Sequence, residues 1–215
     1  MLYPHGEATL AILRLTPVIP VVTVQSVEDA IAQARALIAG GLTVLEVTLR
    51  TPAAMAAVAT LARQFPDATI GAGTVVQADQ IKTATEAGAA FLVSPGMAPH
   101  LVEAAVHSPI PFLPGAATAS EAMALRERGF TALKFFPAEP AGGAEYLAAL
   151  AGPLPNLCFC PTGGIDAQKA PNYLALANVV CVGGSWMVAP GFMAGQDYAK
   201  VEQLAREASR LGRCF

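Results

Sequence analysis

Short runs of β-forming residues recur at regular intervals along the chain, and this alternation restricts the fold more than any other feature. Neighbouring runs begin roughly 20 to 27 residues apart, and alanine-rich helical stretches such as residues 27–39 and 52–64 lie between them. The eight runs are VIPVVTV (18–24), TVLEVTL (43–49), TIGAGTV (69–75), FLVSP (91–95), PFLPGAA (111–117), ALKFFPA (132–138), CFCPTGG (158–164) and VVCVGGS (179–185). This strand–helix alternation indicates a parallel sheet, because each helix carries the chain back to the start of the next strand.

Helix-start signals follow several of these runs. SVED (26–29) and TASE (118–121) have the spacing of a capping box, and Thr51 precedes a proline at the first expected helical position. Residues 7–15 resemble an additional helix before the first strand, and its apolar residues would cover the bottom of a barrel.

Eight βα units in about 200 residues fit one (β/α)₈ barrel, so we expect a single α/β domain over residues 1–215. A doubly wound sheet is the competing architecture. No G-x-G-x-x-G follows the first strand, and no linker divides the chain, which favours the barrel.

The composition restricts location and partners. Hydrophobic residues make up 54% of the 215 residues and charged residues 13%, which suits buried parallel strands or a large oligomeric interface. The formal net charge of −3 gives no general basic field for nucleic acid. The N-terminus lacks the basic region followed by an unbroken apolar region that is typical of a signal peptide. Residues 170–196 are uncharged, but their glycines, asparagines and Pro190 divide them, so we expect no membrane span.

Cysteines and histidines do not form a metal-binding pattern. The cysteines are Cys158, Cys160, Cys181 and Cys214, and the first two form a C-x-C inside a predicted strand. Reduced core thiols are the favoured interpretation over a disulfide or a metal site, and a cytoplasmic location is expected. The scatter of the three histidines also argues against a histidine-bound catalytic metal.

Lys134 is unusual among the four lysines because it lies inside an apolar strand, between Leu133 and Phe135. A buried ammonium group is costly. One interpretation is a lysine that extends to solvent, or one that protects the edge of a sheet. The other is a lysine that its surroundings keep neutral, so that it can act as a nucleophile.

Further polar side chains lie near the ends of other predicted strands, where barrel enzymes carry their catalytic groups. Glu46, Thr48 and Arg50 alternate on one face of the second strand, and Thr74 ends the third. Glu46 and Arg50 could form a structural ion pair. However, they are about 13 Å apart along a strand, so each is expected to face another partner in the barrel mouth.

Glycine pairs end the last two predicted strands, in Thr162-Gly163-Gly164 and in Gly183-Gly184-Ser185. Loops after these strands often bind phosphate through backbone N–H groups in barrels, although a glycine pair alone also suits a simple turn. Together with Lys134, Glu46 and Arg50, they indicate a class I aldolase. Lys134 would form a Schiff base, Glu46 would move protons, and Arg50 with Thr74 would hold the carboxylate of a phosphorylated 2-oxo acid.

The motifs GGLTVLEVTLRT, GAGTV, VSPG, LKFFPAE, FCPTGGI and GGSW resemble the family of 2-keto-3-deoxy-6-phosphogluconate (KDPG) aldolase and 4-hydroxy-2-oxoglutarate (KHG) aldolase, in the family's order from about residue 17 to residue 205. The resemblance implies a (β/α)₈ barrel, a homotrimer, and no cofactor or metal. The segment LPGAAT (113–118) departs slightly, which leaves the pocket wall beside the fifth strand less defined. VTLRT after Glu46 favours the gluconate over the galactonate substrate.

By resemblance, Lys134 is the Schiff-base residue and Glu46 the acid/base. Arg50 and Thr74 would hold the pyruvate carboxylate, and Pro95 and Phe136 would line the pocket. The residues expected to hold the phosphate are Gly163, Gly164, Gly184 and Ser185, and Thr162 is expected as a further substrate-binding residue.

Two alternatives remain at this point. A phosphosugar isomerase or epimerase on the same barrel would explain the glycine pairs and Glu46, but not a lysine between apolar neighbours. A non-catalytic protein that binds a phosphorylated ligand would give no reason for Glu46, Arg50, Thr74 and Lys134 to occur together.

Overall fold

Parallel strands alternate with helices throughout the computed structural model, which describes residues 2–212. The strands are β1 (Val18–Val22), β2 (Val44–Thr48), β3 (Thr69–Gly73), β4 (Phe91–Val93), β5 (Phe112–Leu113), β6 (Gly115–Ala116), β7 (Ala132–Phe135), β8 (Cys158–Pro161) and β9 (Val182–Gly184). The α-helices are α1 (Gly6–Arg14), α2 (Val27–Ala39), α3 (Ala54–Gln64), α4 (Ala78–Glu86), α5 (Pro99–Val106), α6 (Ala119–Glu127), α7 (Gly143–Leu150), α8 (Ala170–Leu174), α9 (Pro190–Ala194) and α10 (Tyr198–Ser209), and a 3₁₀-helix, η1, spans Trp186–Val188.

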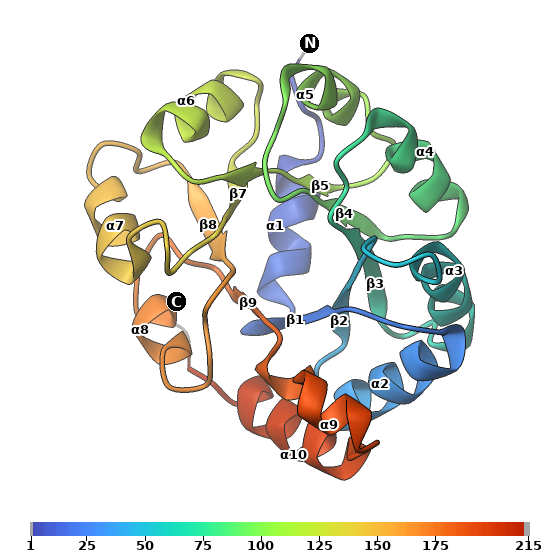
Figure 1. Ribbon diagram of the computed structural model, residues 1–215. Coiled ribbons are helices and arrows are strands. Elements are labelled where there is room, and N and C mark those ends of the chain that lie inside the picture. The colour runs from blue at the N-terminus through green and yellow to red at the C-terminus, as the bar shows by residue number, and fades with distance from the viewer. Residues whose placement is uncertain (1, 213–215) are drawn as a thin grey trace.

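The strands form two parallel sheets that stand around a common axis, with helices outside (Figure 1). One sheet has the order β5-β4-β3-β2-β1-β9 and the other β6-β7-β8. Isolated parallel bridges join Phe159 to Val179 and Thr162 to Gly183, so β8 lies next to β9. The protein therefore has an α/β fold in which parallel strands take a barrel-like arrangement.

Pro114 divides the expected strand over residues 111–117 into β5 and β6. β5 pairs with β4, whereas β6 pairs with β7, so this short segment passes from one sheet to the other. Proline has no N–H to donate, but its carbonyl still accepts a hydrogen bond of 2.8 Å from Lys134 N.

Several observed strands are shorter than the predicted runs at their carboxyl ends. β3 ends at Gly73 and β8 at Pro161, two and three residues before the predicted ends at 75 and 164. The excluded residues leave the extended conformation, because Thr74, Gly163 and Gly164 have φ values of 60°, 107° and 78°. Thr74, Gly163 and Gly164 therefore lie in the loops that follow, whereas Glu46 and Lys134 lie within β2 and β7.

Two of the three expected helix caps form. Ser26 Oγ accepts a hydrogen bond from Asp29 N at 3.1 Å, and Thr118 forms a reciprocal capping box with Glu121. The cap expected at Thr51 was wrong. α3 begins later, at Ala54, because the Thr51 hydroxyl instead donates to Val24 O at 2.7 Å.

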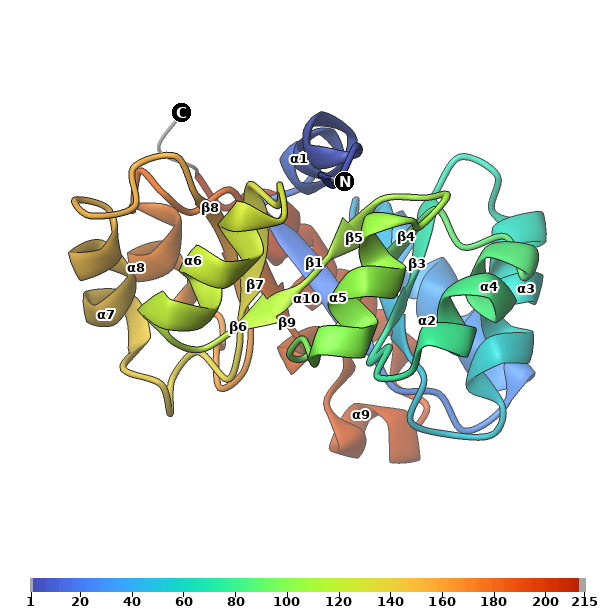
Figure 2. The same ribbon diagram turned by 90° about the horizontal axis from the view of Figure 1, so that it is seen from above.

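α1 crosses the end of the barrel-like arrangement that is opposite to α9 (Figure 2). Leu10 and Leu13 of this helix join a buried cluster with side chains from the strands, including Phe91 and Leu113. Tyr3 fixes the segment before the helix, because its N–H donates to Arg128 O and its hydroxyl accepts from Phe112 N. A second and larger apolar cluster packs the outer helices against the strands.

Within residues 2–212, no helix is long and apolar enough to cross a membrane. Residues 170–196 fold instead into α8, β9, η1 and α9. Cys158 and Cys160 are free thiols, and Cys160 and Cys181 are buried. Cys214 lies outside the described residues.

Candidate active site

The centre of the site is a buried pair formed by Lys134 on β7 and Glu46 on β2. Lys134 Nζ lies 3.0 Å from Glu46 Oε1 and 3.4 Å from Oε2, and the two side chains are only 4% and 5% exposed. β7 is the central strand of its sheet, so Lys134 neither protects an edge nor extends to solvent. The Phe136 ring covers one side, with its centroid 5.4 Å from Nζ. The ammonium group thus has one carboxylate partner in a largely apolar environment.

Gly73, at the end of β3, provides the space that Glu46 occupies. A Cβ atom added at Gly73 would lie 2.2 Å from Glu46 Oε1 and 2.5 Å from its Cγ. In the parallel register of β2 and β3, Gly73 pairs with Thr48, which is two residues after Glu46 on β2. Sequence reasoning missed this role, although a glycine that ends one strand beside a strand with a functional carboxylate is a usable signal.

Arg50 and Thr74 come together just beyond the ends of β2 and β3. Arg50 Nε donates to Thr74 Oγ1 at 3.1 Å. A positive φ is uncommon for a β-branched residue, so the fold holds Thr74 in a strained backbone conformation that presents its hydroxyl to Arg50. Arg50 is not the partner of Glu46, in agreement with their separation along the strand.

The two glycine loops meet around a cavity of about 110 Å³. Seven of the predicted site residues line it: Arg50, Phe136, Thr162, Gly163, Gly164, Gly184 and Ser185. Consecutive positive φ values at Gly163 and Gly164 give the loop a curvature that residues with side chains rarely adopt. The cavity thus has a guanidinium group, hydroxyl groups and exposed backbone on its walls, which suits an anion.

Pro95 does not line this cavity. It follows β4, is half-buried, and lies against Gly115, where an added Cβ atom would be 2.3 Å from the Pro95 carbonyl carbon. Its place in a pocket wall stays a prediction.

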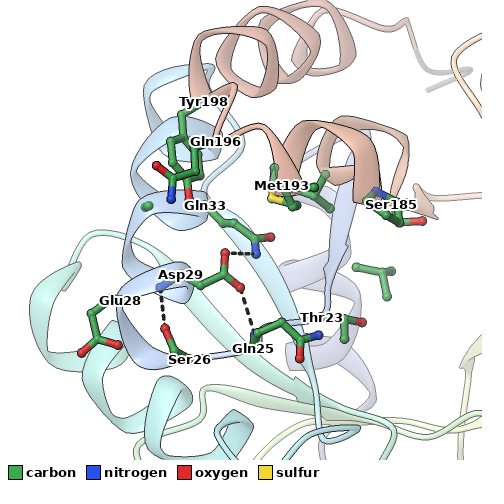
Figure 3. A pocket seen from close by; sticks show the side chains of 15 residues that line it. Thr23, Gln25, Ser26, Glu28, Asp29, Gln33, Ser185, Met193, Gln196 and Tyr198 are labelled. Carbon is green, nitrogen blue, oxygen red and sulfur yellow. Dashed lines mark hydrogen bonds between the residues drawn. The ribbon is translucent and has the colours of Figure 1, made fainter.

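A larger cavity of about 840 Å³ opens beside the small one and shares Val21 and Ser185 with it. α2 forms one wall, and the segment from Ser185 to Tyr198 forms the other (Figure 3). Asp29, which lines this cavity, accepts hydrogen bonds from Gln25 N and from Gln33 Nε2. Among the described residues, no lysine or arginine lines this larger cavity, whereas Arg50 lines the smaller one.

Thr48 does not share the role suggested by its position on the strand. It is fully buried, its hydroxyl donates to Val22 O at 3.0 Å, and it lies 2.9 Å from the Thr23 hydroxyl. Thr48 therefore links β2 to β1.

Sequence reasoning also missed an ion pair behind the Gly163–Gly164 loop, between Glu139 and Lys169. The signal was an acidic residue in LKFFPAE, a few residues after the buried lysine. Among residues 2–212, three or more His, Cys, Asp or Glu side chains never converge in a way that could hold a metal ion.

A buried lysine–carboxylate pair beside an anion-sized cavity, in a barrel-like α/β fold, suits the class of carbon–carbon lyases that use a lysine nucleophile. The family model of KDPG and KHG aldolases matches residues 10–204. The chain belongs to this family, and it is therefore an aldolase.

Individual relatives cover almost the whole chain. KHG/KDPG aldolase of Escherichia coli strain K12 is 47% identical over 198 residues, which are 92% of this chain and 93% of the relative. KDPG aldolase from Legionella pneumophila, solved with pyruvate captured at low pH as a covalent carbinolamine intermediate, has a TM-score of 0.91 and 44% identity, covering 94% of this chain and 98% of that one. KDPG aldolase of Zymomonas mobilis ZM4, solved with 3-phosphoglycerate, has a TM-score of 0.92 and 44% identity, covering 97% and 98%.

Proposed function

We propose that this aldolase cleaves KDPG to pyruvate and glyceraldehyde 3-phosphate, and KHG to pyruvate and glyoxylate. The observation that carries the proposal is the buried Lys134–Glu46 pair, with Nζ and Oε1 3.0 Å apart. A structural ion pair in this position would add little stability, because desolvation of two charges offsets most of their attraction. A nucleophile and its proton acceptor require this proximity.

In the proposed reaction, Glu46 takes a proton from Lys134, and the neutral amine attacks the C2 carbonyl carbon of the substrate. The carbinolamine that forms loses its hydroxyl group as water after protonation by Glu46, which leaves a protonated Schiff base. Glu46, again a carboxylate, removes the proton from the C4 hydroxyl group. The C3–C4 bond then breaks, the aldehyde leaves, and the electron pair of that bond forms an enamine. Protonation at C3 and hydrolysis release pyruvate and restore Lys134.

The surrounding residues would orient the substrate. Arg50, held by Thr74, binds the carboxylate next to C2, while Phe136 and Pro95 provide apolar walls. The phosphate binds at the side of the small cavity that the glycine loops form, which Thr162, Gly163, Gly164, Gly184 and Ser185 line. Lys134 and Glu46 supply the nucleophile and the proton transfers, so the proposed chemistry requires neither a metal nor a cofactor.

We also infer that the two sheets belong to one (β/α)₈ barrel formed by the single domain, closed by the β8–β9 bridges and by the passage from β5 to β6. A homotrimer and a cytoplasmic location are part of the proposal. They are supported by the resemblance to the family, by the apolar composition and by cysteines that follow no disulfide pattern in the sequence.

Borohydride trapping tests the assignment of the nucleophile. Incubation with pyruvate and borohydride should add a reduced pyruvate adduct to the peptide that contains Lys134, and Lys134→Ala should abolish both the adduct and turnover. The exposed Lys82 provides a matched control, since Lys82→Ala should keep both. Labelling of Lys82, Lys169 or Lys200 in the wild type would overturn the assignment, and wild-type turnover without any adduct would favour a different reaction class.

A further inference from the structure

An ion pair lies directly behind the Thr162–Gly164 loop and has no part in the chemistry described above. Lys169 Nζ is 2.7 Å from Glu139 Oε2, and the Tyr173 hydroxyl donates to the other carboxylate oxygen, Glu139 Oε1. The lysine lowers the pKa of Glu139, while Glu139 raises the pKa of Lys169, so both groups are charged at neutral pH. The pair thus joins the segment after β7 to the segment after β8.

The backbone next to this pair and the Lys169 side chain hold three consecutive carbonyl groups of the loop. Ala138 N donates to Thr162 O at 2.8 Å, Glu139 N donates to Gly163 O at 3.0 Å, and Lys169 Nζ donates to Gly164 O at 3.2 Å. In a trans peptide the C=O and N–H bonds point in opposite directions. Fixing the three carbonyls on one side therefore directs the N–H groups of residues 163, 164 and 165 to the other side.

The Glu139 side chain also packs closely against the backbone of this loop. A Cβ atom at Gly164 would lie 2.8 Å from both Cβ and Cγ of Glu139, so the carboxylate stem packs directly on the loop backbone. Glu139 and Lys169 do not line the cavity, whereas Thr162, Gly163, Gly164 and Ile165 do. The ion pair and the cavity thus lie on opposite sides of one stretch of backbone.

We propose that Glu139 and Lys169 are positioning residues for the phosphate end of the substrate. Lys169 holds the Gly164 carbonyl, Glu139 packs on Gly164, and the backbone N–H groups of Ala138 and Glu139 hold the two preceding carbonyls, so that the N–H groups of the loop face the phosphate. This inference rests on the proposed function, because it assigns the phosphate to the cavity beside this loop. It adds a specificity role, since a substrate without phosphate does not need these N–H groups.

A purely structural ion pair would behave differently. The Glu139 and Lys169 side chains are 30% and 45% exposed, and solvent screens such a pair strongly. Its removal would then change the thermal stability slightly and would affect all substrates alike. A change in the ratio of kcat/KM between KDPG and KHG separates the two cases.

The experiment compares Lys169→Met, Lys169→Arg and Glu139→Gln with the wild type. For Lys169→Met, kcat/KM for KDPG should fall about tenfold or more, mainly through KM, and that for KHG should fall much less. Lys169→Arg should restore part of the KDPG activity. Glu139→Gln keeps the packing on Gly164 and should give an intermediate ratio. Inorganic phosphate, as an inhibitor of KHG cleavage, should bind more weakly to Lys169→Met by a similar factor.

Lys82→Met is the matched control, because Lys82 also pairs with a glutamate, Glu86, but in an exposed helix. Lys82→Met should leave the ratio of kcat/KM for KDPG to kcat/KM for KHG unchanged. Equal loss for both substrates, or no loss for either, in Lys169→Met and Glu139→Gln would overturn the positioning role. If Lys169→Met does not fold, the ratios of kcat/KM for the two substrates in Lys169→Arg and Glu139→Gln test the positioning role. Failure of the wild type to cleave either substrate would instead overturn the proposed function.

Discussion

At the scale of single residues, the environment of Lys134 explains why a lysine occupies an apolar strand. Within residues 2–212 its only ionic partner is Glu46, and both side chains are almost completely buried. Burying two charges costs several kcal/mol per ion before their attraction is counted, so apolar residues of similar volume would often be as stable. The proposed chemistry gives the pair a function, because a nearby carboxylate can accept a proton from the amine and return it.

Replacing Glu46 by glutamine should keep the shape of the site and remove its proton acceptor. Because general acid–base catalysis typically contributes about 10²- to 10⁴-fold, kcat should fall by that factor. Borohydride should still trap pyruvate on Lys134, but more slowly. Steady-state kinetics and timed trapping measure the two effects. Glu86→Gln, on an exposed helix, is the control, and unchanged turnover in Glu46→Gln would make Glu46 a structural residue.

Lys134 could be selected from the sequence because its signal is local: a charge among apolar neighbours. Its pairing with Glu46 was not predictable, since the two residues are 88 positions apart and strand alternation specifies a face, not a partner. Thr48 shares the alternation of Glu46, yet it bonds to Val22 and Thr23. The Glu139–Lys169 pair was missed because its importance depends on loop carbonyls, which a sequence pattern does not show.

At the scale of elements, strand β3 contains two glycines that leave space for two different side chains from neighbouring strands. Gly71 and Gly73 alternate onto the same face. A Cβ atom at Gly71 would lie 2.3 Å from the Phe91 ring, whereas one at Gly73 would meet Glu46. The first glycine leaves space for the Phe91 ring, and the second leaves space for the Glu46 carboxylate.

Gly73→Ala should displace the Glu46 carboxylate from Lys134 and lower kcat by at least about tenfold, because proton transfer requires hydrogen-bond distance. Gly71→Ala is a matched control with the same change on the same strand, and its nearest atoms belong to Phe91. It should lower the melting temperature but keep kcat. Both variants are assayed at a temperature at which circular dichroism shows that they are folded. Equal kcat in the two variants would contradict the role assigned to Gly73.

Element positions were predictable where local signals agreed. The helix at residues 27–39 has a serine cap and the expected periodicity, and α2 has these bounds. The ends of strands were less predictable, because apolar residues continue into loops whose backbone turns away, as at Thr74 and Gly163. The division of residues 111–117 at Pro114 depends on two different neighbouring strands, which only the assembled fold brings together.

At the scale of the whole molecule, the two ends of the strands have different tasks. The carboxyl ends carry Lys134, Arg50 and the glycine loops, while α1 covers the opposite end (Figure 2). Leu13 of α1 is 1% exposed and packs into the interior cluster, whereas Leu15, just after the helix, is 60% exposed. Stability and catalysis should therefore be separable by substitutions at opposite ends.

Leu13→Ala should lower stability without changing the chemistry. Loss of a buried leucine side chain costs about 2–5 kcal/mol, which for a chain of this size corresponds to a decrease in Tm of roughly 4–20 °C. At 25 °C, where the variant is still folded, kcat and KM for KDPG should match the wild type, because the interior cluster lies between α1 and the Lys134 pair. Leu15→Ala is the control, since an exposed side chain should shift Tm by little. Calorimetry and steady-state kinetics on the same samples measure both quantities. A fall in kcat of Leu13→Ala that is as large as in Glu46→Gln would show that α1 determines the geometry of the site, and that the two ends are coupled.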